Sequence, residues 1–113
     1  MNQVNLVGRV ARDVQLRKTT NGKPYLFLTI AVSGYWDRRE QKEVTDFIPV
    51  TVWGKEAEKA SHLVKGSLVR ISGRISVGRF TDKEGQKRFT VDIIGEEVDF
   101  LSKPRSAVEV SQG

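Results

Sequence analysis

The sequence has no cysteine, one histidine, one methionine and three prolines among its 113 residues. Without cysteine, the chain forms neither a disulfide nor a cysteine-based metal site. No apolar run approaches the roughly 20 residues of a membrane-spanning helix. The first residues, Met1 to Leu6, lack a charged segment followed by an apolar one, so we expect no signal peptide. These absences favour a cytoplasmic protein with no metal and no membrane contact.

Groups suited to catalysis are also scarce. The one histidine, His62, lies in a segment with helical spacing, where a surface position is favoured over a catalytic role. Asp82 and Glu84 lie in a turn, and Glu96 and Glu97 lie near a break in a strand, without the spacing of metal ligands. No Gly-rich phosphate loop of the Walker type occurs. We therefore expect a protein that is not an enzyme and that uses no cofactor.

Positive charge is what the chain has in excess. It contains 19 Lys and Arg against 14 Asp and Glu, which gives a formal net charge of +5. This balance favours an acidic partner, nucleic acid or an anionic membrane surface, although a mildly basic domain without such a partner has the same totals. The length allows one domain with one core. We expect this domain over residues 1–103, followed by a short flexible tail over residues 104–113, which show no periodicity.

The stretch from Phe47 to Gly54 is the most informative part of the sequence. Successive side chains of a strand point to opposite faces, so Val50 and Val52 share one face with Ile48 and form a core stripe. Phe47 and Trp53 then stand on the other face. Such a strand is either buried on both sides or displays a binding platform. The nearby Lys and Arg favour a platform, because spaced rings beside cations suit single-stranded nucleic acid.

Similar alternation predicts strands on both sides of this stretch. Asn21-Gly22 is a hairpin turn signal, and Gly8 indicates a bulge or a close backbone approach inside the first strand. Apolar residues at helical spacing predict a short helix over Lys55 to Val64. The predicted strands are Val4–Val10, Tyr25–Val32, Val44–Trp53, Leu68–Val77 and Phe89–Ile94, with an extension over Val98–Leu101 after a break at Gly95.

Three strands, a helix and two further strands follow the order of the OB-fold. We therefore predict an all-β protein, a five-stranded Greek-key barrel with one short helix between the third and fourth strands. The oligonucleotide surface of this fold uses strands two and three and the loops between strands one and two and between strands four and five. The fold alone does not fix the function, because OB-folds also bind sugars, tRNA and proteins.

The segment from Ser33 to Glu43 is predicted to be a long polar connection, and long loops in compact domains are often functional. It contains Trp36 among charged side chains. Two interpretations of this ring stay open. It folds back onto the core, or it is exposed and available to a ligand.

Several motifs resemble those of bacterial single-stranded DNA-binding proteins. They occur in the order of that family and cover about residues 2 to 101. Singly each motif is weak, whereas together they are specific. They include Asn2-Gln3-Val4-Asn5-Leu6-Val7-Gly8-Arg9, Val52-Trp53-Gly54-Lys55, Lys65-Gly66-Ser67-Leu68-Val69, Gly73-Arg74 and Phe80-Thr81-Asp82.

The resemblance implies a non-catalytic, nucleoid-associated protein that binds single-stranded DNA without strong sequence preference. Such proteins protect the strand during replication, repair or recombination, and they usually assemble as homotetramers. The resemblance implies base stacking on Trp36, Phe47, Trp53 and Phe80. It implies basic contacts from Lys55, Lys65 and Arg79. By location alone we add Arg38, Arg39, Arg70 and Arg74.

The chain also departs from the family pattern. Val14 replaces a usual Pro, Lys18 stands where an aromatic residue is common, and Pro49 interrupts the outward face of a strand. Because Pro cannot donate to a strand ladder, pairing near Pro49 is an open question. The long Gly/Pro/Gln-rich tail with an acidic tip is missing, so partners recruited through such a tail are not expected. A natural short form and a shortened chain both fit this ending.

Alternatives to the DNA-binding interpretation remain. Phe47 and Trp53 could pack at a subunit interface. Phe27, Phe89 and Phe100 are assigned to the core or to an interface rather than to DNA. A different function is that of an OB-fold adaptor in a primosome-like assembly, which would bind protein or RNA. Competition between DNA and RNA oligomers would separate the two functions.

Overall fold

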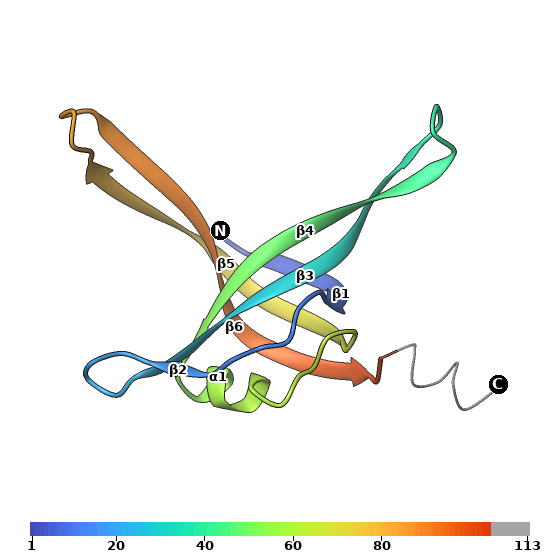
Figure 1. Ribbon diagram of the computed structural model, residues 1–113, viewed down its shortest axis with the longest axis horizontal. Helices are drawn as coiled ribbons and strands as arrows, with labels where there is room; N and C mark the ends of the chain where they lie inside the picture. Colours follow the sequence, from blue (N-terminus) through green and yellow to red (C-terminus); the bar gives the residue numbers. More distant parts are fainter. Residues whose placement is uncertain (105–113) are drawn as a thin grey trace.

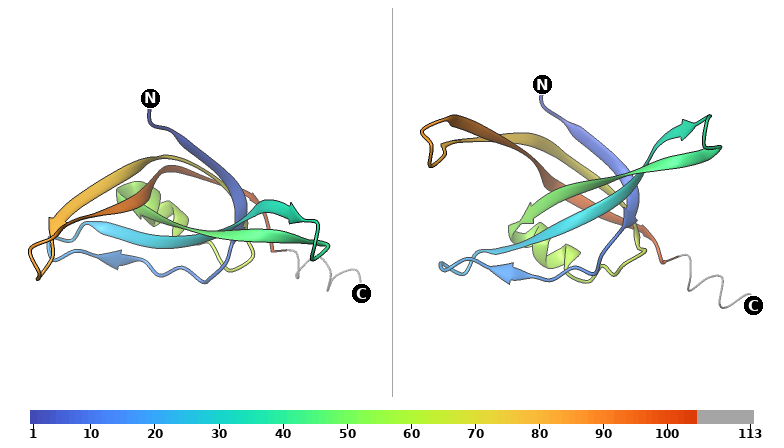
Figure 2. Two further views of the ribbon diagram at one scale, coloured as in Figure 1. Left: turned by 90° about the horizontal axis from the view of Figure 1, so that it is seen from above. Right: turned by 45° about the horizontal axis from the view of Figure 1, so that its top comes forward.

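Six strands and one short helix form residues 1–104, the part of the chain that the computed structural model describes (Figure 1). Two long hairpins, β3–β4 and β5–β6, diverge from the barrel, and α1 lies at the other end (Figures 1 and 2). Of the tail expected over residues 104–113, only Pro104 lies within the described part of the chain. The elements are β1 (Val4–Val10), β2 (Arg17–Lys18), β3 (Pro24–Asp37), β4 (Lys42–Trp53), α1 (Gly54–Ala60), β5 (Leu68–Thr81) and β6 (Lys87–Ser102).

The sheet closes into a barrel. Its strand order is β1-β5-β6-β4-β3-β2, and an additional pairing of β1 with β3 joins the two ends around five long strands. All pairings are antiparallel except that of β4 with β6. The short β2 pairs with β3 alone and forms the outer edge. The predicted OB-fold barrel with one short helix between its third and fourth long strands is confirmed.

The core is the set of inward positions that the alternation predicts. Leu26, Leu28 and Ile30 of β3 are fully buried, and Val50 and Val52 of β4 pack beside them. Ala57 and Ala60 of α1 close one end of this cluster. Small side chains there let the helix approach the strands closely. The other buried apolar residues are Val10, Val69, Ile71 and Val98.

Gly8 allows β1 to lie against two strands at once. It pairs with Val69 of β5, while the neighbouring Arg9 pairs with Ala31 of β3. A β-carbon on Gly8 would collide with the backbone oxygen of Ala31. The close approach expected from the sequence is therefore confirmed, and the absence of a side chain there lets the barrel close.

Both hairpins are longer than the sequence predicts. The polar connection expected over Ser33 to Glu43 is wrong for most of its length, because β3 reaches Asp37 and β4 begins at Lys42. In the remaining turn, Oδ1 of Asp37 accepts the backbone N–H groups of Arg39 at 2.9 Å and Glu40 at 3.2 Å. Backbone pairing between two strands needs no buried face, so polar residues extend the ladder beyond the core.

The helix is shorter than predicted. It ends at Ala60 rather than at Val64. Beyond it, the N–H groups of Ser61 and Leu63 donate to carbonyls three residues earlier, so the chain tightens into turns. Gly66, with a positive φ of 94°, lies in the connection between α1 and β5.

Two further predictions need correction. The two-residue strand β2 was not predicted, because two residues are too few to show alternation. The expected break at Gly95 is instead a bulge in one continuous strand, β6. Ser72 pairs with Glu97 and Gly73 pairs with Gly95, which leaves one residue of β6 unpaired.

Pro49 does not interrupt the sheet. It lies directly opposite Thr29, and the register continues without a shift through this pair. The carbonyl of Thr29 accepts a hydrogen bond from Ala11 at 2.8 Å, so it faces away from β4. Thr29 and Pro49 therefore form a non-hydrogen-bonded pair, in which neither residue donates to the other strand. The missing N–H of Pro49 costs this hairpin no bond.

Candidate nucleic-acid interface

Three of the predicted stacking residues share one outer face of the β3–β4 hairpin. Residues directly opposite each other in a ladder share a face, and the register pairs Trp53 with Tyr25, Phe47 with Ala31 and Trp36 with Glu43. Their exposed fractions are 38% for Trp53, 64% for Phe47 and 59% for Trp36. The other face of the same strands forms the core. The hairpin is therefore not buried on both faces in this chain, and Trp36 does not pack onto the core. We call the outer face that carries Trp36, Phe47 and Trp53 the aromatic platform.

A bulge places Trp36 on this platform. The pairing shifts between Ser33 and Tyr35, so Gly34 is an extra residue in β3. Beyond it the alternation is inverted, and Tyr35 lies opposite Val44 on the other face. A β-carbon on Gly34 would lie 2.8 Å from the backbone oxygen of Val44. A glycine at this position accommodates the bulge without that clash.

Two aromatic residues near Trp53 were not predicted as ligand contacts. The ring centroid of Tyr25 lies 5.0 Å from that of Trp53 and 5.6 Å from that of Phe27. Lys23 places its Nζ atom 5.0 Å from the centre of the Trp53 ring. Phe27 is 60% exposed, so it does not belong to the core of this chain. The outward alternation of Tyr25 and Phe27 was visible in the sequence, but their contact with Trp53 depends on cross-strand register.

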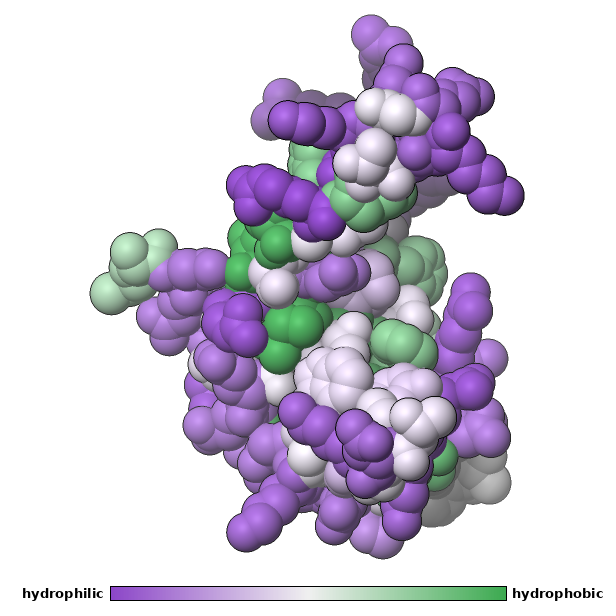
Figure 3. All heavy atoms as spheres, turned by 90° about the vertical axis from the view of Figure 1, so that its left-hand side faces the viewer, coloured by the Kyte–Doolittle hydropathy of each residue, from purple (hydrophilic) through white to green (hydrophobic). Residues whose placement is uncertain are grey.

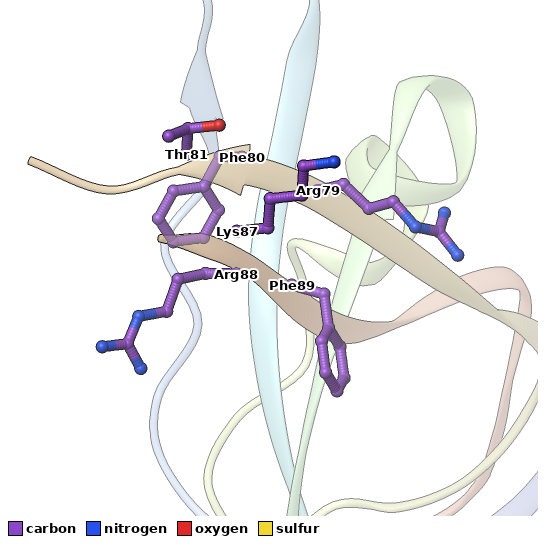
Figure 4. A pocket seen from close by; sticks show the side chains of 6 residues that line it. All are labelled: Arg79, Phe80, Thr81, Lys87, Arg88 and Phe89. Carbon is purple, nitrogen blue, oxygen red and sulfur yellow. The ribbon is translucent and has the colours of Figure 1, made fainter. Parts of the chain in front are cut away.

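The tip of the β5–β6 hairpin carries a fourth ring. Phe80 lies opposite Arg88, and Arg79 lies opposite Phe89, so the two phenylalanines occupy opposite faces of the hairpin. Phe80 is 52% exposed and Phe89 is 69% exposed. Both belong to the six residues of this tip that line a hollow of about 450 Å³ (Figure 4). Phe80, a predicted stacking residue, and Arg79, a predicted basic contact, are adjacent in the chain but project from opposite faces of the hairpin.

The β5–β6 hairpin also exposes apolar side chains nearer the barrel. Ile75 is 42%, Val77 is 43% and Val91 is 58% exposed. Figure 3 shows apolar surface in the middle of the side of the molecule to which this hairpin projects, between charged ends. Phe100, also assigned to the core or an interface, is 52% exposed on β6. None of these side chains belongs to the barrel core.

Five of the predicted cations are exposed and form no ion pair within residues 1–104. Arg38 and Arg39 occupy the turn next to Trp36, and Lys55 follows Trp53 at the start of α1. Lys65 is anchored through its backbone N–H, which donates to Oδ1 of Asp13 at 3.0 Å. The fifth is Arg79 of β5. Their charges are free to meet an anion.

Arg70 and Arg74 are held differently. Nη2 of Arg70 lies 2.7 Å from Oδ2 of Asp99 and 3.4 Å from Oε1 of Glu97, and Nε of Arg74 lies 3.4 Å from Oε2 of Glu96. The hydrogen bond from Arg70 lowers the pKa of Asp99. In the closed order of strands, β5 lies across the barrel from β3 and β4. These two arginines are thus directed away from the aromatic platform.

Asp82 orders the turn at the tip of the β5–β6 hairpin. Its carboxylate accepts Nε–H of Arg88 at 2.8 Å and the N–H groups of Glu84 and Gln86 at 2.9 Å each. The hydrogen bond from Arg88 is the largest of the effects that lower the pKa of Asp82. The carboxylate therefore stays ionised and holds the tip that presents Phe80.

Within the described part of the chain, no three His, Asp or Glu side chains gather closely enough to hold a metal ion. In the same residues, no helix has both the length and the apolar character required to cross a membrane.

Comparison with known proteins gives a family. The model of the single-strand binding protein family matches residues 1–101. Single-stranded DNA-binding protein 1 of Clostridium acetobutylicum is 38% identical over 110 residues, which cover 96% of this chain and 100% of that protein. Single-stranded DNA-binding protein 3 of the same organism is 41% identical, over 89% of this chain and 71% of that protein. The single-stranded DNA-binding protein of Halalkalibacterium halodurans is 39% identical, over 95% and 64%. The chain belongs to the single-strand binding protein family.

Proposed function

We propose that this protein binds single-stranded DNA with little sequence preference and protects it during replication, repair or recombination. The observation that carries the proposal is the common outer face of Trp36, Phe47 and Trp53, all of them exposed. A row of rings exposed to water is unfavourable in the free protein, and a ligand that covers the rings removes this cost. Membership of a family named for single-strand binding supports the same conclusion.

Stacking and charge supply the binding energy in this proposal. Each base stacked on an aromatic ring contributes roughly 1–3 kcal/mol, and every base has a face that can stack. Phe80 adds a fourth ring, and Arg38, Arg39, Lys55, Lys65 and Arg79 neutralise phosphates. Arg70 and Arg74 remain untested predictions, and their ion pairs make them weaker candidates. A duplex hides the faces of its bases, so single strands bind in preference to duplex.

The proposal includes self-association, as a homotetramer. The first half of β1 pairs with β5 along one edge, and its pairing with β3 begins only at Arg9. That leaves a strand edge able to pair with a second copy. The exposed apolar side chains of the β5–β6 hairpin offer further surface for such contacts. Measurement of the mass in solution by light scattering tests this part, and a monomer at all concentrations would contradict it.

The nature of the ligand can be tested with the two tryptophans as reporters. Oligo-dT is titrated at low and high salt while tryptophan fluorescence is followed, with a duplex of equal length as the control. We expect strong quenching by the single strand, little response to the duplex and weaker binding at high salt. No quenching and no binding at low salt would overturn the proposal.

The adaptor alternative is tested in the same assay. An RNA oligomer of the same length is added as competitor to the complex with oligo-dT. The DNA-binding proposal predicts that RNA does not displace oligo-dT more readily than an unlabelled DNA oligomer of the same length does. An adaptor specialised for RNA would show the reverse order. The same proposal places the protein in the cytoplasm at the nucleoid, which imaging of a fluorescent fusion checks.

A further inference from the structure

A row of side chains crosses three strands beside the platform. Arg17 of β2 lies opposite Tyr25 of β3, and Tyr25 lies opposite Trp53 of β4. Opposite residues share a face, so all three project outward together. Phe27 is two residues further along β3 and therefore projects from the same face. Because β2 is the last strand of the sheet, no strand within residues 1–104 lies beyond Arg17.

The rings of this row are in direct contact. Tyr25 lies 5.0 Å from Trp53 with the ring planes tilted by 32°, and 5.6 Å from Phe27 with the planes at 76°. Both separations are within the range of favourable aromatic pairs. Since Phe27 is 60% and Trp53 is 38% exposed, the three rings form a continuous aromatic surface that reaches solvent.

Cations border this surface. Nζ of Lys23 lies 5.0 Å from the centre of the Trp53 ring, within the range of a cation–π contact. Arg17 is exposed, and its guanidinium has one weak contact, with Oε1 of Gln15 at 3.5 Å. Exposed aromatic rings bordered by cations are the combination on which the bases of single strands stack.

We propose that Tyr25 and Phe27 form an additional nucleotide subsite next to Trp53, with Arg17 and Lys23 neutralising the adjoining phosphates. The inference rests on the proposed function and extends the path of the strand from Trp53 toward β2. The base at this subsite contacts the rings of Phe27 and Tyr25. Trp53 then holds an inner position in the path instead of the last one.

Phe27→Ala is the variant that tests the subsite, and Tyr35→Ala is its matched control. Tyr35 is 61% exposed, on the same strand, but projects from the opposite face. Binding of dT oligomers of increasing length is measured for the wild-type chain and both variants, after thermal melts confirm that each is folded. We expect Phe27→Ala to weaken binding of long oligomers at least about fivefold. The shortest oligomers that bind should lose nothing, because they do not reach the subsite, and Tyr35→Ala should bind like the wild type.

Tyr25 needs a separate test, because it could hold the Trp53 ring in place without touching DNA. In a Trp36→Phe background, Trp53 is the only tryptophan and its emission reports its surroundings. We expect Tyr25→Phe to bind oligo-dT like the wild type. We expect Tyr25→Ala to bind it more weakly, as Phe27→Ala does. Loss of affinity in Tyr25→Ala with a shifted Trp53 emission, but no loss in Phe27→Ala, would overturn the subsite in favour of a packing role.

Charge gives an independent check. Arg17→Gln is compared with Lys18→Gln, because Lys18 lies opposite Pro24 and projects from the other face of β2. Arg17→Gln should reduce the slope of log affinity against log salt by about 0.7, and Lys18→Gln should leave it unchanged. Equal slopes for Arg17→Gln and the wild type would show that Arg17 makes no phosphate contact.

The failure of the subsite can be told apart from the failure of the proposed function. If the wild type binds oligo-dT but Phe27→Ala binds equally well at every length, only the subsite is wrong. If the wild type does not bind, the proposed function fails as well.

Discussion

Trp36 and Trp53 project from the same outer face of the β3–β4 hairpin because one extra residue, Gly34, interrupts the alternation of β3. Counted from Tyr25 in steps of two, Tyr35 would join the platform and Trp36 would project from the opposite face. The bulge reverses this assignment. Because Gly34 has no partner on β4, Trp36 rather than the adjacent Tyr35 belongs to the candidate interface.

Insertion of one residue between Val44 and Thr45 should exchange the two rings, because it gives Gly34 a partner on β4 and removes the bulge. In a Trp53→Phe background, Trp36 is the only tryptophan, so its quenching by oligo-dT reports its position on the platform. We expect the insertion to abolish most of this quenching, because Trp36 then projects from the other face. Deletion of Gly34 is the matched control, since it leaves Trp36 opposite Glu43 and should keep the quenching. Unchanged quenching in the insertion variant would show that the bulge does not control the face.

Removal of a ring proposed to stack on a base should cost affinity and leave the fold intact. We expect Trp53→Ala and Phe80→Ala each to weaken binding of oligo-dT by roughly 1–3 kcal/mol. Phe89→Ala is the matched control for Phe80, since it removes an exposed ring from the opposite face of the same hairpin. Calorimetric titration measures the affinity, and circular dichroism checks the fold. Unfolding of a variant would instead mark its ring as part of the core.

Cations beside the platform should control the salt dependence. Replacing Arg38 and Arg39 with Gln should lower the slope of log affinity against log salt by about 0.7 for each lost phosphate contact. The same change at Arg70 and Arg74 should have a smaller effect, because each of these guanidinium groups must first leave a carboxylate. Titrations at several salt concentrations give both slopes. A larger change in the second pair would place DNA on the opposite wall of the barrel.

Gly73 should be far less replaceable than Gly78 on the same strand. A β-carbon on Gly73 would collide with the backbone oxygen of Ile94 at the bulge of β6. On Gly78 it would meet only the Thr90 Oγ1 atom, 2.8 Å away, and that side chain can rotate. We expect Gly73→Ala to reduce the free energy of unfolding by about 2–3 kcal/mol, and Gly78→Ala to reduce it by well under half as much. Urea denaturation decides the order, and equal losses would contradict it.

Acid should weaken the fold partly through Asp99. Its pKa is lowered in the folded protein, first by the hydrogen bond from Arg70, so its ionised form is favoured by folding. That contribution to stability is complete above the ordinary pKa of Asp, about 4, and is lost as the pH falls through the lower folded value. Arg70→Gln should therefore make the free energy of unfolding less dependent on pH below about 4. Denaturation across this range measures it, and an identical acid dependence would assign the effect to other carboxylates, such as Asp82.

The sequence by itself determined the barrel and most of its surface pattern. Side chains of a strand alternate with a period of two, so the buried row of Leu26 and Leu28 and the exposed positions of Phe47 and Trp53 follow from local order. Turn residues and the order of strands and helix were also local signals, and they predict the OB-fold. Gly8 marked a close approach because only glycine leaves room for one.

Only the tertiary structure decided which of these residues act together. The face of Trp36 depends on a bulge that becomes visible only when β4 is laid against β3. Contact between Tyr25 and Trp53, and the ion pair of Arg70 with Asp99, join residues 28 and 29 positions apart in the chain. A sequence shows which side chains are available at each face. Register and closure determine which of them meet, because those contacts are made between strands rather than within one.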